Sequence, residues 1–399
     1  MKAAGDELAI EGGRPVRAER LPLHKPWFAE REEAAVRGVL SGTHVAGDGV
    51  HGRELERLLA ESTGARGVLA VNSCSAALEM AVQIAGLSPG DEVILPSFTF
   101  VSTANAVLKA GARPVFADIH PLTLGLDPLD VERRVTPRTR AILPVHYAGM
   151  ACDMAALDAI AERHNLQVIE DAAHGINATY RNRALGACGS LGALSFHETK
   201  DLVCGEGGAL LIRDDQTRLH AAEILREKGT DRTAFLRGER DRYTWVGCGS
   251  SYVLSELLAA VAVVQFQKVP EITRRKTAQA DRLLAVLAPY RGLIQLPVVP
   301  ASCRPNWHVF AVLVDPARRD WVLEALRAEG VSAAFHYIPL HSAPYARQSP
   351  DIAPVELPVT DRVSASLVRL PISAAFSEAD CEDVVAACVK VFDRLAAGA

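Results

Sequence analysis

The chain has 399 residues, of which 49% are hydrophobic and 23% charged, a composition typical of globular proteins rather than disordered or collagen-like ones. Its 43 Lys and Arg against 48 Asp and Glu give a net charge of −5. This balance disfavours a dedicated nucleic-acid binder, because such proteins usually carry a basic excess. No apolar run approaches the roughly 18 residues that span a bilayer, and the N-terminal residues show no apolar stretch of a secretory signal.

The eight cysteines are scattered along the chain, and no two of them form a C-x-x-C pair. This spacing disfavours zinc-ribbon and thioredoxin-type sites. Scattered cysteines without an export signal are typical of free thiols in a reducing compartment. We therefore expect a cytoplasmic protein that binds no membrane, no nucleic acid and no metal ion.

The length predicts two or three domains, and the pattern along the chain suggests where they divide. Residues 1–50 are mixed and interrupted by Gly and Pro, which predicts an irregular N-terminal arm. Short apolar runs then alternate with Ala- and Leu-rich helical patterns, which indicates a mostly parallel sheet with helices on both faces. We expect strands at 68–71, 92–95, 114–118, 141–145, 167–170 and 209–212, and helices at 75–85, 102–110, 129–134 and 153–164. Within these, Gly111 is placed to end one helix and Asp153 to cap another.

The pattern changes after about residue 250, where longer helical stretches precede isolated strands. We expect helices at 254–269, 272–287, 319–329 and 378–395, and strands at 293–296, 308–314, 333–337 and 367–370. The predicted fold is therefore α/β. A large domain occupies residues 51–250, and linking helices with a smaller α+β domain occupy residues 251–399.

In open α/β sheets, ligands bind at the carboxyl ends of the strands, so the residues after each predicted strand are the candidates. Residues 72–78, Asn-Ser-Cys-Ser-Ala-Ala-Leu, form a turn of small residues that enters a helix. The free N–H groups and hydroxyls of such a turn can bind an anion. Taken alone, a serine that caps the helix without any ligand is the simpler explanation.

Two further residues are candidates, one at the end of a predicted strand and one ahead of a predicted strand. Asp171 ends a buried strand, and a buried carboxylate needs a partner, which could be a following helix, an arginine or a protonated ring nitrogen. Lys200 lies among small and apolar residues, ahead of a glycine-rich turn at 205–208. A lone lysine is usually a solvated surface residue, but a desolvated one has a lowered pKa and can form a Schiff base.

Together the three features are more specific than any one of them. An anion-binding helix start, an acid that ends a strand and a desolvated lysine are the parts needed to hold pyridoxal 5′-phosphate (PLP). The helix start binds the phosphate, the acid keeps the pyridine nitrogen protonated, and the lysine carries the aldehyde.

The chain resembles, from about residue 21 to its C-terminus, the fold-type-I PLP aminotransferases, and among them the DegT/DnrJ/StrS-type sugar aminotransferases. The similarity rests on residues 72–80, 90–105, 144–149, 170–174, 195–208 and 335–341. Residues 195–200, 226–230 and 243–245 are most similar to the dTDP-4-amino-4,6-dideoxygalactose transaminases.

This resemblance implies a role for each candidate residue. Lys200 is implied to be the Schiff-base lysine and the acid and base of the proton shift. Asp171 is implied to bind the pyridinium nitrogen and His174 the phenolic oxygen. Phe100 is implied to stack on the ring, and core packing is its alternative.

The remaining implied ligands hold the phosphate and the substrate. Related chains bring an asparagine from the partner subunit to the phosphate, in a Gly-Tyr-Asn-Tyr-Arg-like stretch. Here Ser251 takes the place of that asparagine and Val253 that of the arginine. The other implied phosphate ligands are Cys74, Ser75 and Ser195. The residues implied to lie near the sugar nucleotide are His336, Tyr337 and His341, for which a structural role is the alternative.

The implied reaction moves the amino group of L-glutamate to C4 of a dTDP-4-keto-6-deoxyhexose, leaves 2-oxoglutarate, and yields the galacto or gluco product. Because such sites take residues from two chains, we expect a homodimer, with a tetramer as the alternative. Other open functions are amino transfer to a 3-keto sugar nucleotide or a keto-inositol, and non-catalytic PLP binding. Lys200 disfavours a sugar 3-dehydratase, in which a histidine replaces the lysine. A nucleotide-binding dehydrogenase is also disfavoured. Residues 247–249, Gly-Cys-Gly, lack the third glycine of the dinucleotide-binding motif and the strand that precedes it.

Overall fold

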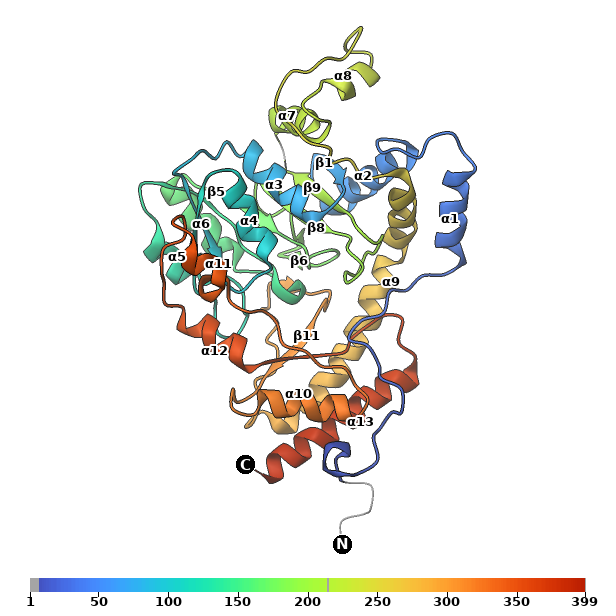
Figure 1. Cartoon of the computed structure of the whole chain (residues 1–399), viewed down its shortest axis with the longest axis vertical. Coiled ribbons are helices and arrows are strands. Elements are labelled where there is room, and N and C mark those ends of the chain that lie inside the picture. Colours follow the sequence, from blue (N-terminus) through green and yellow to red (C-terminus); the bar gives the residue numbers. More distant parts are fainter. Residues whose placement is uncertain (1–6, 214, 399) are drawn as a thin grey trace.

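The computed structural model describes residues 7–213 and 215–398, so residues 1–6 of the predicted arm lie outside the described residues. Figure 1 shows a large upper part built around a sheet and a smaller lower part, which includes the first described residues and the last helix. One long helix, α9 (Glu256–Leu287), runs through both parts. The predicted α/β class with a large sheet domain is therefore confirmed.

A seven-stranded sheet in the order β1-β9-β8-β5-β4-β2-β3 forms the centre of the upper part. Its strands are β1 (Gly67–Val71), β2 (Glu92–Pro96), β3 (Arg113–Ala117), β4 (Thr139–Ile142), β5 (Gln167–Asp171), β8 (Leu191–Ser195) and β9 (Gly208–Ile212). All neighbours pair in parallel except β9, which is antiparallel to both β1 and β8. The sheet is buried on both faces, which explains why most of its strands are continuous apolar runs. Strand β8 was not predicted, because Gly192 and Ala193 give it no β-branched pattern.

Helices cover both faces of this sheet. They are α3 (Cys74–Ile84), α4 (Val101–Lys109), α5 (Pro128–Arg134), α6 (Met154–His164) and α7 (Gln216–Arg226). The short helix α8 (Arg232–Leu236) packs on α7 and lies away from the sheet. The predicted helix ends are confirmed at two positions. The Asp153 carboxylate accepts a hydrogen bond from the Ala156 N–H at the start of α6. Gly111 follows the end of α4 with φ of 77°, a conformation that favours glycine.

The lower part is a smaller α+β unit. Its elements are β10 (Cys303–Arg304), β11 (Phe310–Leu313), α10 (Arg319–Ala328), α12 (Pro358–Ser366), β12 (Leu367–Leu370) and α13 (Glu378–Ala397). Strand β10 pairs with β6 (Thr179–Tyr180) of the upper part, and β6 pairs in turn with β7 (Arg183–Ala184). The short helix α11 (Pro344–Gln348) packs on the upper part, where Ala346 joins the core around the sheet. Short 3-10 helices lie at Ala9–Glu11, Tyr147–Gly149, Ala288–Tyr290 and Leu340–Ser342. The two helices predicted at 254–269 and 272–287 are one helix, because Val269 and Ile272 continue the same buried face across Pro270.

Three sequence-based expectations are wrong. Residues 293–296 and 333–337 are not strands but contribute single bridges at Gln295 and Ala334. Their apolar side chains pack into the core of the lower part, which gives the same sequence pattern as a strand. The predicted irregular arm contains α1 (Glu30–Leu40), which packs on α9, and α2 (Val50–Thr63) begins at its end. The Gly and Pro residues that suggested irregularity lie on either side of α1.

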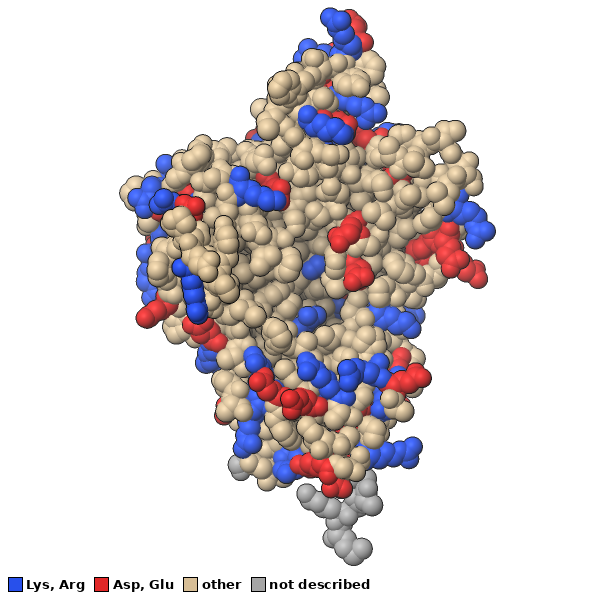
Figure 2. Space-filling view, viewed as in Figure 1, with Lys and Arg blue, Asp and Glu red and all other residues tan. Residues whose placement is uncertain are grey.

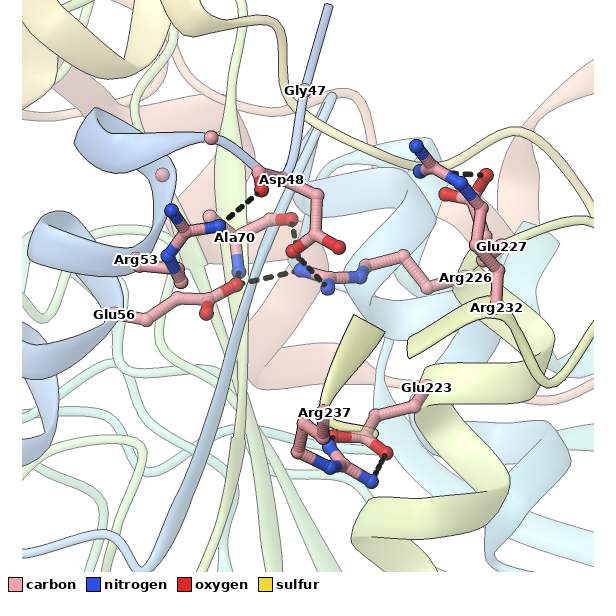
Figure 3. A network of polar contacts seen from close by, with 12 residues as sticks. Gly47, Asp48, Arg53, Glu56, Ala70, Glu223, Arg226, Glu227, Arg232 and Arg237 are labelled. Carbon is pink, nitrogen blue, oxygen red and sulfur yellow. Dashed lines mark hydrogen bonds and ion pairs between the residues drawn. The ribbon is translucent and has the colours of Figure 1, made fainter. Parts of the chain in front are cut away.

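A buried ion cluster joins α2 and α7 to β1. Figure 3 shows the Arg226 guanidinium pointing between Asp48 and Glu56. Arg226 donates to the Glu56 carboxylate at 2.6 Å and to the Asp48 carboxylate at 3.1 Å. The same Glu56 oxygen accepts from the Ala70 N–H of β1 at 2.9 Å. Because Arg226 is only 3% exposed, its two carboxylate partners depend on it for their neutralisation.

Replacing Arg226 with Met is expected to lower the free energy of unfolding by about 3–5 kcal/mol, because two carboxylates lose their buried cation. Denaturant titration measures the loss. Arg237→Met is the matched control, since Arg237 pairs with Glu223 at a far more exposed position. The control should lose less than about 1 kcal/mol. Equal losses in the two variants would contradict the prediction.

Candidate active site

The residues that the sequence singles out meet at the edge of the sheet where β1, β5 and β8 end. Strand β9 starts at this same edge because it runs antiparallel to its neighbours. Figure 2 shows a hollow between the upper and lower parts, with Lys or Arg side chains exposed inside it and acidic side chains beside it. The edge of the sheet therefore opens towards the lower part of the molecule.

The start of α3 forms one wall of the site. The Ser73 hydroxyl accepts from the Ala76 N–H and so caps the helix. The N–H groups that precede Ala76 in the helix have no acceptor within the helix, as at any helix start. The Ser75 hydroxyl lies 2.7 Å from the Ser102 hydroxyl of α4. Gly208 lies against the Cys74 backbone, since a Cβ there would stand 2.6 Å from the Cys74 nitrogen. The serine cap is therefore present, and the first N–H groups of α3 remain available to an anion.

Ser195 lies across from the same helix start. It ends β8 and is paired with Gly208, which in turn contacts Cys74. The Ser195 hydroxyl accepts from the His197 N–H at 3.4 Å. Burial raises the pKa of the Cys74 thiol well above its ordinary value, so the thiol is neutral. The structure thus brings Cys74, Ser75 and Ser195 together, with no negative charge among them to repel a phosphate.

Asp171 is a buried carboxylate at the end of β5. It accepts from the Thr103 hydroxyl at 2.8 Å and from the Ala173 N–H at 3.1 Å. Over the described residues it makes no ion pair, and the chain after it forms turns rather than the helix it could have capped. Burial raises its pKa, because desolvation disfavours the charged form. Such a carboxylate is suited to a cationic ligand.

His174 is fixed in one tautomer by the backbone. Its Nδ1 accepts from the Ala148 N–H at 3.2 Å, which leaves the proton of the neutral ring on Nε2. Burial lowers the pKa of His174 well below its ordinary value, and the charge of Lys200 lowers it further. The ring is therefore a neutral hydrogen-bond donor through Nε2, which suits a ligand oxygen.

Lys200 lies in a loop whose two ends are tied together. The backbone N–H groups of Phe196, Glu198 and Cys204 donate to carbonyls of the same loop at 2.8–2.9 Å. Burial lowers the pKa of Lys200, while the nearby Cys74 and Asp171 oppose that shift. A lysine amine with a lowered pKa is more often neutral, and the neutral amine is the form that attacks a carbonyl.

The uptake of PLP by the apoprotein is expected to quicken as the pH rises, because the Lys200 amine loses its proton. Since burial lowers this pKa from 10.5, half of the maximal rate should be reached below pH 10.5. Stopped-flow absorbance measures the rate at each pH. Nα-acetyl-lysine amide in solution is the control, with its midpoint near the ordinary pKa of about 10.4. A midpoint for the protein at or above that of the control would contradict the prediction.

Phe100 and the residues implied to bind the substrate surround these groups. Phe100 is 59% exposed, so core packing does not explain it. His336 lies 3.1 Å from the Tyr147 hydroxyl through Nδ1, and Tyr337 packs edge-on against Tyr147. Tyr147 also packs against the His174 ring at 5.9 Å. His336 and Tyr337 therefore join the aromatic cluster around His174.

Two other predicted residues lie elsewhere along this edge. His341 bonds to the Ser97 hydroxyl at 2.8 Å and faces Asp361 at 3.3 Å, so its ring is fully engaged in structural contacts. Ser251 is exposed, and its carbonyl accepts from the Asn72 side chain at 3.1 Å. Within one chain, Ser251 thus lies beside the turn that leads into α3.

A buried polar group lies next to Lys200 and was not predicted from the sequence. Lys276 of α9 pairs with Asp201 at 2.5 Å, and both are buried. His308 stacks 4.2 Å from the His174 ring and lies 3.6 Å from Asp201. A cavity of about 10 Å³, lined by Lys200, Asp201 and Lys276 together with residues 24–27, lies between this group and the N-terminal segment. The only available signal was that Asp201 follows Lys200 directly.

The fold and this set of side chains define an aminotransferase. The model of the DegT/DnrJ/EryC1/StrS aminotransferase family matches residues 27–389. The spore coat polysaccharide biosynthesis protein SpsC of Bacillus subtilis is 34% identical over 375 residues, which cover 92% of this chain and 96% of SpsC. The chain belongs to this family of sugar aminotransferases.

Solved structures agree with this assignment. S. venezuelae DesV is 34% identical, with a TM-score of 0.86, over 94% of this chain and all of that one. The aminotransferase TlmJ from Streptoalloteichus hindustanus is 30% identical, with a TM-score of 0.86 and the same coverage. Helices able to cross a membrane are absent from the described part of the chain. Within residues 7–213 and 215–398, no three His, Cys, Asp or Glu side chains form a group suited to a metal ion.

Proposed function

We propose that the chain is a PLP-dependent aminotransferase that moves the amino group of L-glutamate to C4 of a dTDP-4-keto-6-deoxyhexose. The product is a dTDP-4-amino-4,6-dideoxyhexose for deoxyamino-sugar biosynthesis. The observation that carries this proposal is the meeting of Lys200, Asp171 and the start of α3 at one edge of the sheet. When bound there, PLP supplies an electron sink for the negative charge that develops at the reacting carbon.

The buried groups of the chain match the parts of PLP. Among the residues that the structure describes, Asp171 has no cationic partner, so it can hold the protonated ring nitrogen. His174 can donate from Nε2 to the phenolic oxygen, and the exposed ring of Phe100 can cover the face of the pyridine. The free N–H groups at the start of α3 and the hydroxyls of Ser75 and Ser195 can bind the phosphate.

Lys200 then acts twice. Its neutral amine would hold the cofactor through its aldehyde when PLP is bound. Once free, the same amine could accept the proton from the donor's α-carbon and return it as an acid. In the second half of the reaction the same amine moves the proton in the opposite direction. The lowered pKa of Lys200 favours both steps, since an amine already protonated could not accept a proton.

The direct test follows the visible absorbance of the PLP-loaded protein. L-Glutamate should bleach the band, and dTDP-4-keto-6-deoxyglucose should restore it, after which NMR of the product gives the C4 configuration. Bleaching without restoration would leave an aminotransferase with another acceptor, such as a 3-keto sugar nucleotide or a keto-inositol. A band that no amino donor bleaches would favour non-catalytic PLP binding.

We also propose that two chains form a homodimer in the cytoplasm. The segment with α7 and α8 projects from the upper part (Figure 1), and Trp245 in this segment is 79% exposed. Large exposed aromatic rings such as Trp245 and Phe100 are typical of surfaces that another chain covers. The free thiols of all eight cysteines suit a reducing compartment. Light scattering should give twice the chain mass of 42.8 kDa, and a mass of one chain would contradict the proposal.

A further inference from the structure

A buried ion pair anchors the loop that carries Lys200. The Lys276 ammonium of α9 donates to the Asp201 carboxylate at 2.5 Å, and the two side chains are 0% and 2% exposed. Although burial opposes ionisation, the charge of Lys276 keeps the pKa of Asp201 well below its ordinary value. A buried ion pair adds little stability compared with apolar side chains of similar size. Its effect on the structure therefore lies in what the two charges hold in place.

Lys276 ties three segments of the chain together. Its ammonium also donates to the His308 carbonyl at 3.1 Å, so α9 is joined both to the loop after β8 and to the chain that leads into β11. The Nδ1 atom of His308 lies 3.6 Å from the same Asp201 oxygen. Because Asp201 follows Lys200 directly in the chain, these contacts fix the backbone position of Lys200.

The same contacts extend to His174. The rings of His308 and His174 lie against each other, with centroids 4.2 Å apart and planes inclined by 37°. His174 is the proposed donor to the phenolic oxygen of PLP, and Lys200 is the proposed holder of its aldehyde. These two substituents are attached to neighbouring carbons of the pyridine ring, so the residues that bind them must keep a fixed separation. The ammonium of Lys276 is bonded to the neighbour of each of these two residues.

We propose that Lys276 is a positioning residue of the reaction, which holds Lys200 and His174 at the separation that the cofactor requires. This inference rests on the proposed function and adds a residue that lies outside the set of cofactor ligands. Lys276 is fully buried, and its side-chain hydrogen bonds go to Asp201 and His308. It therefore acts through these two residues and not on the substrate.

The first test compares Lys276→Met with the wild type in single turnovers of the PLP-loaded protein. At saturating L-glutamate, the rate of bleaching should fall about 100-fold, because that is the usual effect of a displaced reacting group. The L-glutamate concentration that gives half of the maximal rate should change less than about threefold, since no group that contacts the donor is altered. A weaker affinity with an unchanged maximal rate would overturn the proposal.

Lys390→Met is the matched control for the loss of a buried ion pair. Lys390 of α13 pairs with the buried carboxylate of Glu329 at 2.9 Å in the smaller part of the molecule. Each variant leaves a buried acid without its cation, so both should lose stability in denaturant titrations. Only Lys276→Met should lose rate. An equal loss of rate in Lys390→Met would make general destabilisation the cause and would contradict a positioning role.

The double variant Asp201→Asn, Lys276→Met separates position from charge. It leaves no uncompensated buried charge, so its stability should return towards that of the wild type. Its maximal rate should stay at least about 10-fold below the wild-type rate, because no ammonium joins the loop to the His308 carbonyl. Recovery of the wild-type rate would reduce the pair to a stabilising element. If Lys276→Met does not fold by circular dichroism, the double variant carries the kinetic test.

Labelling of the apoprotein gives a readout that needs neither PLP nor turnover. Reductive methylation followed by mass spectrometry of the peptide reports how much of the Lys200 amine is neutral at each pH. Burial lowers the pKa of Lys200, and the negative charge of Asp201 opposes that shift, while the Lys276 ammonium offsets Asp201. Other groups whose charges act on Lys200, and which no variant alters, are Cys74 of α3, Asp171 of β5 and Arg369 of β12.

The labelling midpoint of Lys200 should rise by about 0.5–1 pH unit in Lys276→Met, because a nearby positive charge is removed. It should return to the wild-type value in the double variant and stay there in Lys390→Met. An unchanged midpoint in Lys276→Met would show that the pair does not act on Lys200, and the proposal would be wrong. If no amino acid bleaches the wild type, the proposed function fails, whereas the labelling result still shows whether Lys276 acts on Lys200.

Discussion

Replacing Lys200 with Ala is expected to abolish turnover by about 10⁴-fold or more while leaving the fold intact. The variant loses the amine that would hold the cofactor's aldehyde carbon and the group that would move the proton. Stability should not fall, because burial already disfavours the charged amine, as the lowered pKa of Lys200 shows. Circular dichroism reports the fold, and formation of 2-oxoglutarate reports turnover.

The control for this variant is Lys109→Ala. Lys109 forms an exposed pair with Glu79 at the end of α4, so its removal should leave turnover and the visible absorbance band unchanged. In Lys200→Ala, that band should be replaced by the spectrum of free PLP. If Lys200→Ala turned over at the wild-type rate without any added amine, the assignment of Lys200 would be wrong.

Replacing Asp171 with Asn is expected to lower kcat about 10³-fold, which is the usual size of a lost electrostatic contact inside an active site. The amide keeps the shape of the carboxylate but cannot stabilise a protonated pyridine nitrogen. Single-turnover bleaching by L-glutamate measures the effect. Retention of the wild-type rate within about threefold would contradict this role.

The stability of the same variant should change in the opposite direction. Burial raises the pKa of Asp171, so the folded apoprotein binds the proton more tightly than the unfolded chain does. The resulting loss of stability sets in as the pH rises above the ordinary value of 3.8. Apo Asp171→Asn should therefore be at least as stable as the wild type at pH 7. Asp158→Asn, at a half-buried carboxylate of α6 whose pKa burial also raises, is the control that should retain full activity.

The sequence predicted the helices of the larger part most closely, since α3, α4, α5 and α6 lie within one residue of their predicted bounds. Strands β1, β2, β5, β9 and β12 lie within one residue of their predicted bounds, because full burial gives short, continuous apolar runs. Local pattern could not distinguish a strand from a core-packing loop at residues 293–296. It also could not show that Val269 and Ile272 lie on one continuous helix across Pro270. These outcomes depend on tertiary packing that a short window does not contain.

The same dependence on tertiary packing decides which parts of the site could be predicted from the sequence. Asp171 ends a predicted strand and the turn before α3 follows one, so sheet topology alone predicts that these two meet. Lys200 was recognised from its small and apolar neighbours and from the resemblance, because the strand before it was not predicted. His308 comes from the smaller part of the molecule. Its approach to the His174 ring, at 4.2 Å between ring centroids, depends on how the two parts pack together, which no local motif records.

The pairing of β1 with β9 has a consequence for folding. Strands β8 and β9 are close in the chain and can pair early, whereas β1 joins β9 only across a long stretch of sequence. Until β1 docks, the start of α3 cannot reach Gly208 and Ser195, so the phosphate site does not yet exist. Because loops this long close slowly, partly folded chains should have no affinity for PLP. Ligand binding then favours only the completed fold, and PLP should act as a folding ligand that shifts the equilibrium without accelerating its first steps.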